Sequence, residues 1–447
     1  MTKLRSIALG TLILFLNLMG ERAVAQERHE FSLQQAVDYA KKNSVQVKNA
    51  LLDVLIQEQT NREVTGTAYP QIHASGSLTY NAKLPVSLVP AEFFGGQPGT
   101  FQKLAFGVKW NSTGGISLSQ ILFDGQVFTG LQARTTLIDF QNKNVEVTEE
   151  AITANVYKIY YQLVVAKSQI ALLDANIARL DKLVHDTKII YDNGFAEKLD
   201  IDRLNVQMTN LQTEKTNAEV QMNNGYLGLK TLMGMPIKDE LVLTDSLSDE
   251  QVKEGVLEAG QFTYAQRKDY QLSELGIKLR QYDIQRYKMS KIPTLSLNGY
   301  YNKNAQRNKF DFLKGGDWFD ISAFTLNLNI PIFTGFSANS RIEKARLALQ
   351  QSVNQREAMK INIDNEMQTA VNNFNAAISR LDYQKQNMTL AETVYNQTKK
   401  KYEIGTGSQT DITNAQTDLK TAQTNYINAL YNAVIARVDY LQATGKL

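Results

Sequence analysis

The chain has 447 residues, with 48 lysines and arginines against 45 aspartates and glutamates, and it contains no cysteine. A formal net charge of only +3 gives no indication of a nucleic-acid partner. The lack of cysteine excludes a disulfide scaffold, a cysteine metal site and an N-terminal lipid-modified cysteine. Glycine and proline are scarce, at 26 and 7 residues, which favours a mostly helical protein.

The N-terminus is typical of an export signal. Lys3 and Arg5 precede an apolar run over residues 7–19, and an Ala-Val-Ala segment follows at residues 23–25. The apolar run is shorter than the ~20 residues that a membrane-spanning helix needs. We therefore expect residues 1–25 to be a removed signal peptide, with the mature chain beginning near Gln26.

One pattern occurs twice in the chain, about 211 residues apart. The residues of one turn motif, Tyr191, Gly194 and Asp200, recur as Tyr402, Gly405 and Asp411. Such self-similarity indicates one structural unit that was duplicated and fused. We expect a first repeat (helix, β-hairpin, long helix, helix) over residues 26–235, a linker over 236–262 and a second repeat over 263–447. The stretch from Pro70 to Phe123 in the first copy is 13 residues longer than the matching stretch from Pro293 to Phe333 in the second. We expect this insertion to be an exposed loop over residues 85–98.

The helical part has the period of a coiled coil. From Ile152 to Tyr191, apolar residues advance by alternating steps of four and three, and only Thr187 interrupts the seam. The second copy keeps the seam with smaller and more polar residues. The proline-free stretches 126–191 and 337–402 have 66 residues each, so each helix is ~100 Å long. Together with the runs after the two turns, they predict four long coiled-coil rods.

Four other segments, residues 72–81, 114–123, 294–302 and 324–330, alternate apolar with small polar residues. Each has about the length of a tilted transmembrane β-strand. The alternative is the edge of a soluble β-sandwich, but no other apolar layer in the chain is left to cover the strands. We therefore expect transmembrane β-structure.

Four strands cannot close a barrel, and β-structure that spans lipid must close. The known single-chain barrels begin at 8 strands. The chain must therefore oligomerise; a dimer would supply 8 strands and a trimer 12, and the arithmetic does not choose between them.

Together these motifs resemble the TolC-type outer-membrane efflux proteins over essentially the whole mature chain. The resemblance rests on the two turn motifs and on a leading helix, a strand start and two strand-to-helix corners: Leu33, Ala36, Ala40, Tyr69-Pro70, Phe123-Asp124-Gly125 and Phe333-Thr334-Gly335. It implies a homotrimer with a 12-stranded β-barrel in the outer membrane and a 12-helix α-barrel across the periplasm. It also implies an equatorial band, to which residues 236–262 would contribute.

The resemblance further implies an exit duct of a tripartite efflux or type I secretion system, located in the lipid bilayer of the outer membrane with a long periplasmic extension. A periplasmic adaptor protein would engage its tip, and an inner-membrane pump would drive transport. The alternative is a periplasmic coiled-coil structural or adaptor protein. The alternating strands favour the duct, because a soluble adaptor has no use for them.

The resemblance places a gate at the periplasmic tip. Asp411 matches the family residue that faces the pore constriction, although Ser408 and Asp411 also fit a capping box at the start of a helix. Tyr402 and Asp200 would hydrogen-bond between neighbouring hairpins and hold the tip closed. At the position where relatives often carry a basic residue, this chain has Gly407.

We expect the adaptor to contact the two turns at the tip. The predicted contact residues are Tyr191, Gly194, Gly405 and Gly407. The alternative is that the glycines only allow tight helix-terminating turns.

Nothing in the sequence indicates an enzyme. His29, His73 and His185 lie on three different segments, and no pair has metal-ligand spacing. No nucleophile elbow, P-loop or dinucleotide-binding loop occurs. We expect no catalytic residue, metal or cofactor.

Overall fold

The computed structural model describes residues 28–247, 252 and 262–447. The predicted signal peptide, and residues 248–251 and 253–261 of the predicted linker, lie outside them. The chain forms two compact units. We call Met1–Leu51, Asn144–Tyr270 and Met359–Leu447 the tip unit, and Leu52–Lys143 and Gln271–Ala358 the sheet unit.

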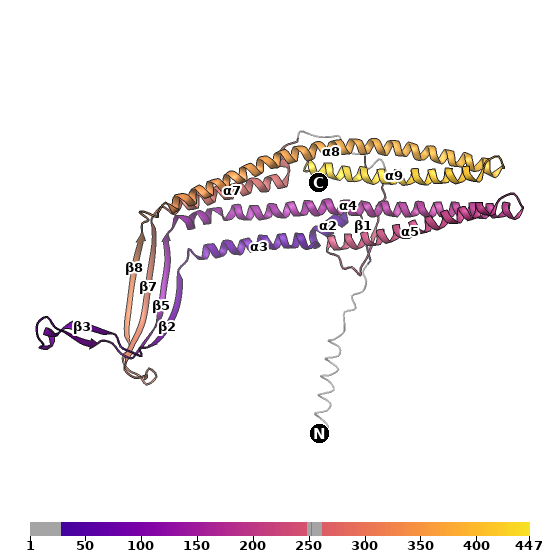
Figure 1. Ribbon diagram of the computed structural model, residues 1–447. Helices are drawn as coiled ribbons and strands as arrows, with labels where there is room; N and C mark the ends of the chain where they lie inside the picture. The colour runs from indigo at the N-terminus through magenta and orange to yellow at the C-terminus, as the bar shows by residue number, and fades with distance from the viewer. Residues whose placement is uncertain (1–27, 248–251, 253–261) are drawn as a thin grey trace, which may run out of the picture. The chain divides into compact units, whose positions relative to one another are not determined.

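The elements follow one another as two similar series (Figure 1). The first series is β1 (Arg28–Phe31), α2 (Leu33–Asn43), α3 (Val45–Gly66), β2 (Gln71–Tyr80), β3 (Val86–Pro90), η1 (Ala91–Phe94), β4 (Phe101–Ala105), β5 (Trp110–Phe123), α4 (Gly125–Asp192) and α5 (Lys198–Met233). The second is β6 (Glu240–Leu243), η2 (Tyr264–Gln266), α7 (Lys268–Met289), β7 (Thr294–Arg307), β8 (Phe319–Asn329), α8 (Ser337–Glu403) and α9 (Gln409–Ala443). The two longest helices, α4 and α8, have 68 and 67 residues.

The two repeats are also alike in how their returning helices end. Gly234 follows α5 and Gly445 follows α9, both at positive φ. A Cβ on Gly234 would lie 2.3 Å from the carbonyl oxygen of Asn43, just before α3. A Cβ on Gly445 would lie 2.9 Å from the carbonyl oxygen of Gln266, just before α7. In both copies, therefore, the returning tip helix ends against the start of the short helix, and glycine allows that close approach.

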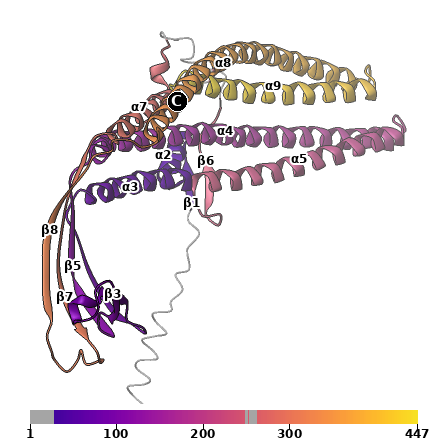
Figure 2. The same cartoon turned by 60° about the vertical axis from the view of Figure 1, so that its left-hand side comes forward.

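The sheet unit orders its helices as it orders its strands (Figure 2). The antiparallel sheet has the order β2-β5-β7-β8. The helices contact in the order α3, α4, α7, α8, through three polar pairs. These are Asn61 with the Arg134 carbonyl (3.1 Å), Gln132 with Gln285 (3.5 Å) and Glu274 with Arg356 (3.0 Å). The outer elements on the two sides are α3 with β2 and α8 with β8.

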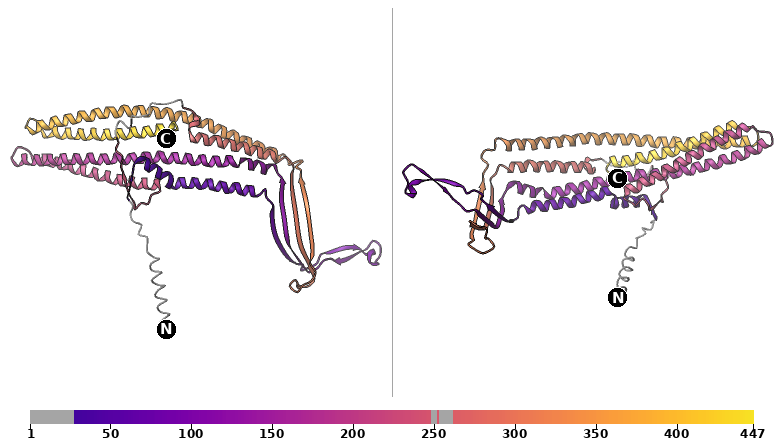
Figure 3. Two further views of the ribbon diagram at one scale, coloured as in Figure 1. Left: turned by 180° about the vertical axis from the view of Figure 1, so that it is seen from behind. Right: turned by 60° about the horizontal axis from the view of Figure 1, so that its bottom comes forward.

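The tip unit consists mainly of two antiparallel helical hairpins, α4–α5 and α8–α9 (Figure 3). Their apolar seams are covered, since all predicted seam positions from Ile152 to Thr187 and from Ile363 to Tyr402 are buried or half-buried. Tyr191, the last position of the first seam, is exposed. The coiled-coil period read from the sequence therefore describes the packing within the chain.

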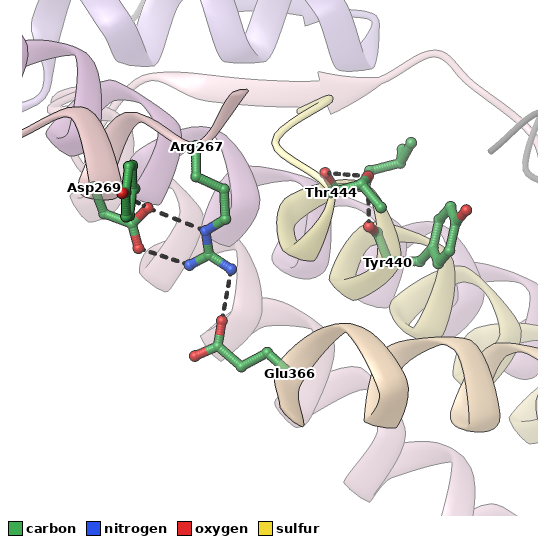
Figure 4. A network of polar contacts seen from close by, with 7 residues as sticks. Arg267, Asp269, Glu366, Tyr440 and Thr444 are labelled. Carbon is green, nitrogen blue, oxygen red and sulfur yellow. Dashed lines mark hydrogen bonds and ion pairs between the residues drawn. The ribbon is translucent and has the colours of Figure 1, made fainter. Parts of the chain in front are cut away.

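A short segment fastens α8 to the start of α7 (Figure 4). The guanidinium of Arg267 donates two hydrogen bonds to Asp269, at 3.0 and 2.7 Å, and one to Glu366, at 2.7 Å. The Arg267 side chain is only 12% exposed. Nearby, the Thr444 hydroxyl at the end of α9 donates to the carbonyl oxygen of Tyr440 at 2.9 Å. The Arg267 contacts therefore hold α8 to the start of α7.

The insertion over residues 85–98 is more ordered than the sequence predicts. Its first part forms β3, which pairs antiparallel with β4 from Val86–Ala105 to Pro90–Phe101. The helix η1 and a glycine-rich turn join the two strands. The expectation of a plain loop was therefore wrong, because proline and glycine confine the turn to the end of the segment and leave the alternating residues on either side free to pair.

Candidate functional site

The strand register brings the apolar sides of all four strands onto one face of the sheet. Ile72 lies opposite Leu118, Leu118 opposite Gly299, and Gly299 opposite Phe324. We call this side the apolar face; its large residues are Ile72, Leu78, Ile116, Leu118, Leu295, Leu297, Phe324, Leu326 and Leu328. The opposite, polar face carries hydroxyl and amide side chains such as Ser75, Ser117, Asn298 and Asn327. Such a sheet, with one apolar and one polar side, is typical of β-structure between lipid and water.

Aromatic residues lie at both ends of the sheet. At the end away from the helices, the Trp110 ring centroid is 4.7 Å from that of Tyr80 and 5.1 Å from that of Phe310. At the helical end, the Phe123 and Phe128 rings are 5.7 Å apart, and the Phe333 and Phe336 rings 5.4 Å apart. Aromatic girdles of this kind mark the two interfaces of a membrane.

The sheet has two free edges, and its outer helices have exposed apolar residues. Among the described residues, β2 and β8 each pair on one side only. On α3, Leu55 and Ile56 are 52% and 61% exposed, and Leu347 on α8 is 61% exposed. Free edges cannot persist in lipid, and apolar stripes of this kind mark interaction surfaces. None of the helices in the described part of the chain has the length and hydropathy of a membrane-spanning helix.

The two predicted tip turns have the same backbone geometry. Gly194 and Gly405 adopt φ values of 82° and 76°, and nothing lies within 4 Å of a Cβ built on either residue. Gly407 differs, since a Cβ there would lie 3.1 Å from the backbone nitrogen of Tyr402. Gly194 and Gly405 are thus required by backbone conformation, and Gly407 by a close approach.

Sequence reasoning missed two apolar residues beside these turns. Phe195 is 86% exposed and Ile404 is 73% exposed, each directly next to the turn glycine. Tyr191, which was predicted, is 39% exposed. The available signal was their position, because both residues lie off the coiled-coil seam in the turns that reverse the two helical hairpins.

The structure forms the capping box at the second tip. The Asp411 backbone N–H donates to the Ser408 hydroxyl at 3.1 Å, and the Ser408 backbone N–H donates to the Asp411 carboxylate at 3.2 Å. The hydrogen bond from Ser408 holds the pKa of Asp411 below its ordinary value, and the nearby charge of Lys401 acts in the same direction. Asp411 is nevertheless exposed, so capping the helix leaves its carboxylate facing solvent.

Tyr402 joins the two hairpins within one chain. Its hydroxyl lies 3.2 Å from the hydroxyl of Thr187, the residue that interrupts the first seam. Thr187 is fully buried. Asp200 instead accepts a hydrogen bond from the backbone N–H of Glu197 at 3.3 Å, at the start of α5. The polar residue in the seam therefore has a partner, which the heptad pattern alone did not show.

Further polar contacts join the two hairpins farther along the helices from the turns. The Asn176 side chain donates to Gln423 at 3.2 Å, and Arg179 donates to the same Gln423 at 3.3 Å. Lys420 on α9 pairs with Glu214 on α5. Between these contacts and the turns lies a groove lined by Arg179, Lys182, Leu183, Asp186, Ile189, Ile190, Tyr395, Lys399, Tyr402, Glu403 and Ile412. The two hairpins are thus held together by a few hydrogen bonds and ion pairs next to an open groove.

Known proteins of one family are similar to this chain in sequence and in fold. Residues 261–446 match the model of the outer membrane efflux protein family. The chain is 22% identical to outer membrane protein TolC of Vibrio cholerae over 338 residues, which cover 74% of this chain and 76% of that protein. It is 20% identical to TolC of Escherichia coli, over 77% and 71% of the two chains. These similarities support a TolC-type outer-membrane efflux family for the chain.

Solved structures of TolC-type channels share this fold. The CusC structure aligns with a TM-score of 0.75 at 16% identity, over 92% of this chain and 91% of that one. VceC of Vibrio cholerae aligns with a TM-score of 0.70 at 15% identity, over 92% and 96%. Members of the TolC family are outer-membrane channels rather than enzymes. The similarity to these channels therefore favours the duct over the alternative of a periplasmic structural or adaptor protein.

Proposed function

We propose that this chain is the outer-membrane exit duct of an efflux or secretion system, with its sheet in the bilayer and its helices in the periplasm. The observation that carries the proposal is the register of the sheet, which places the apolar residues of four strands from both repeats on one face. Aromatic residues at both ends of the sheet support this placement. The polar face would then line an aqueous channel.

The duct would assemble as a homotrimer. In each protomer β2 and β8 need a partner, as do the exposed apolar residues of α3 and α8. Joining β2 of one copy to β8 of the next satisfies both edges and gives 12 strands with three copies. Each protomer would consist of two repeats, over residues 26–235 and 263–447, joined by an equatorial segment over 236–262.

The helical tips would receive the periplasmic adaptor, which connects the duct to an inner-membrane pump. Phe195 and Ile404 are large, apolar and exposed beside the two turns. Apolar side chains displayed at the end of a long polar rod favour contact with a protein. Tyr191, Gly194, Gly405 and Gly407 shape the same surface.

The gate would lie at the second tip. One Asp411 from each of three protomers would surround the pore and favour cations over anions. The exposed carboxylate with its lowered pKa would stay ionised across the physiological pH range. Tyr402 and Asp200 would restrain the hairpins in the closed state. The Tyr402–Thr187 contact supports a restraint at Tyr402, and an Asp200 contact would have to form between protomers.

Two neighbouring residues of β8 test the placement of the sheet. Leu326 lies on the apolar face and Asn327 on the polar face. A lysine on the lipid side of a barrel costs about 2–4 kcal/mol near the bilayer midplane, whereas a lysine facing the lumen stays hydrated. We therefore expect Leu326→Lys to reduce the yield of folded protein in the outer membrane sharply and Asn327→Lys to leave it nearly unchanged.

Fractionation and planar-bilayer conductance measure the outcome. The unmodified chain should require detergent for extraction and should form channels, and Asn327→Lys should form channels of altered selectivity. If Leu326→Lys is tolerated as well as Asn327→Lys, or if the chain is extracted without detergent, the sheet is not in the membrane and the proposal fails.

A further inference from the structure

The connection between β2 and β5 displays large apolar side chains to solvent. We call residues 86–105, from the start of β3 to the end of β4, the outer hairpin. Five of its large apolar residues are more than half exposed: Val86 (58%), Leu88 (62%), Phe93 (79%), Phe94 (58%) and Phe101 (65%). A solvated loop has no use for so much apolar surface. Something must therefore cover this hairpin.

The apolar residues of the outer hairpin gather on one side. The pairing of β3 with β4 places Val86, Leu88 and Phe101 on the same face, together with Lys103. The other face carries Ser87 and Gln102 beside the half-buried Val89 and Leu104. The hairpin is thus amphipathic.

The tip of the outer hairpin is closed by its own hydrogen bonds. The backbone N–H of Ala91 donates to the carbonyl of Thr100 at 2.8 Å, and that of Gly96 donates to the carbonyl of Ala91 at 2.9 Å. The carboxylate of Glu92 accepts from the backbone N–H of Gly99 at 3.0 Å. These bonds satisfy backbone groups that would otherwise oppose removal from water, and they leave Phe93 and Phe94 pointing outward.

The position of the outer hairpin in the sheet unit indicates what covers it. The hairpin leaves the sheet between Tyr80 and Trp110, the aromatic pair at the end away from the helices. If the sheet spans the outer membrane as proposed above, this end lies at the outer interface. The root of the hairpin is then at the level of the lipid headgroups.

Charge also favours lipid as the occupant. Lys83, Lys103 and Lys109 lie in or beside the hairpin and are exposed, and the one acidic residue between them, Glu92, caps the tip. The other connection at this end, between β7 and β8, is different. There Arg307 donates to the carbonyl and the carboxylate of Asp311 at 2.8 and 3.0 Å and stacks on Phe312 at 5.1 Å. That loop carries two acidic residues, Asp311 and Asp317, beside Lys309 and Lys314, whereas the outer hairpin has only the tip-capping Glu92 against its three lysines.

We propose that the outer hairpin lies on the outer leaflet of the membrane that the sheet spans. Its apolar face and Phe93 and Phe94 enter the boundary between headgroups and acyl chains, and its lysines bind the anionic headgroup phosphates. Strands of 5 residues are about half the length needed to cross the bilayer. The free edges of the hairpin also need water. The hairpin therefore rests at the interface and anchors the mouth of the duct.

The absence of native cysteine makes single-site labelling a direct test. An environment-sensitive fluorophore is attached to Phe93→Cys or Leu88→Cys in the full chain. The labelled protein is reconstituted into vesicles of phosphatidylethanolamine and phosphatidylglycerol that contain a lipid with a nitroxide near the headgroup. We expect strong quenching at both sites and weak quenching at the matched control Ser87→Cys on the opposite face. Replacing Lys83, Lys103 and Lys109 with glutamine should reduce the quenching at Phe93→Cys.

A label at Leu326→Cys separates this inference from the proposed function. If Leu326→Cys is not quenched by a nitroxide deep in the acyl chain, the placement of the sheet itself fails. If Leu326→Cys is quenched but Phe93→Cys and Leu88→Cys are quenched no more than Ser87→Cys, the sheet is in the membrane and the hairpin is not on it. Efficient disulfide formation between Phe93→Cys residues of neighbouring copies would likewise overturn the inference, since it would show that the hairpins cover one another.

Discussion

The returning helices of the two hairpins, α5 and α9, arise from the same repeat and yet are buried to different extents. In α9, 14 of 35 residues are buried, whereas in α5 only 4 of 36 are. α9 packs between α8 and α4, through Phe374–Tyr440 at 6.0 Å on one side and Lys158–Asp439 at 2.6 Å on the other. α5 is an edge helix, with Val206 and Leu199 62% and 51% exposed.

This difference explains why the second seam is rich in alanine. A helix between two neighbours needs small residues on two sides to be approached closely, whereas α5 packs mainly along α4, meets α2 at its end and pairs with α9 through Glu214 and Lys420. Ala422 and Ala433 on α9 are buried, and the positions 211 residues earlier on α5 hold the larger Leu211 and Met222. The two hairpins therefore share one sequence pattern, and the helix that is more buried carries the smaller side chains.

The largest expected effect comes from leucine truncations that compare the interior helix with the edge helix. Leu419 on α9 is 1% exposed and Leu227 on α5 is 43% exposed. Leu419→Ala should destabilise the fold by about 2–5 kcal/mol, because it leaves a cavity, and should lower the temperature at which circular dichroism detects loss of helix. Leu227→Ala should mainly weaken association between copies. If Leu227→Ala lost helix at the same reduced temperature, α5 would not be an edge helix.

The two turns should respond alike to substitution. At both, alanine should strain the turn, whereas asparagine should keep its backbone conformation. Gly194→Ala and Gly405→Ala should each cost about 1–2 kcal/mol, the strain of a left-handed alanine, because no atom obstructs the new methyl group. Asparagine tolerates this conformation. Gly194→Asn and Gly405→Asn should therefore keep trimer yield and impair efflux if the adaptor contacts the turns. Normal efflux by both asparagine variants would assign the glycines to the turn alone.

The cap and the gate at the second tip can be separated by a matched pair of variants. Ser408→Ala removes the capping hydroxyl, at a cost of ~1 kcal/mol, and keeps the carboxylate. Asp411→Ala removes both the cap and the charge. In planar bilayers we expect Asp411→Ala to weaken cation preference and block by multivalent cations, while Ser408→Ala keeps both. If Asp411→Ala alters only thermal stability, Asp411 is a cap and the gate lies elsewhere.

The lowered pKa of Asp411 also predicts a pH dependence. A carboxyl group whose pKa is depressed by folding stabilises the folded state above its unfolded pKa, and this contribution is lost as pH falls through the folded value. The difference in thermal midpoint between the unmodified chain and Asp411→Asn should therefore be constant near neutral pH and should vanish only below the ordinary range for aspartate. A difference that disappeared near pH 6 would contradict the cap.

The smallest effect is expected at the single hydrogen bond between the hairpins. Tyr402→Phe and Thr187→Val should each cost ~0.5–1.5 kcal/mol and raise channel conductance by releasing the tip. Because the two hydroxyls bond to each other, the double variant should behave like either single one. If the effects of Tyr402→Phe and Thr187→Val on conductance add up in the double variant, Tyr402 acts through another partner. Asp200→Ala then tests whether Asp200, the partner that the family resemblance implies, is that residue.

Much of the fold could be predicted because its signals are periodic. The seam from Ile152 and the alternation from Ile72 each repeat a single rule over many residues, so helix and strand were recognised from the spacing of apolar residues. The family motifs added the two turns. What spacing cannot supply is the partner of a residue that breaks the rule. Thr187 appeared as an interruption of the seam, and only the structure shows its contact with Tyr402.

Local pairing and exposure escaped prediction for a similar reason. Residues 85–98 were expected to form a loop because they are rich in proline and glycine, although Val86 and Phe101 on either side of the turn form strands. Phe195 and Ile404 were overlooked because a turn was judged by its glycine and not by its neighbours. Both cases depend on which side chains the folded backbone leaves uncovered, and that depends on contacts between segments distant in the sequence.

The claim that identical copies must close the sheet is tested most directly by the mass of the protein extracted from the outer membrane. Native mass measurement in mild detergent should give three chains, in a form that conducts ions when it is inserted into a planar bilayer. A folded monomer or dimer would contradict the account, because the edges of β2 and β8 would then remain open or close with a different number of strands.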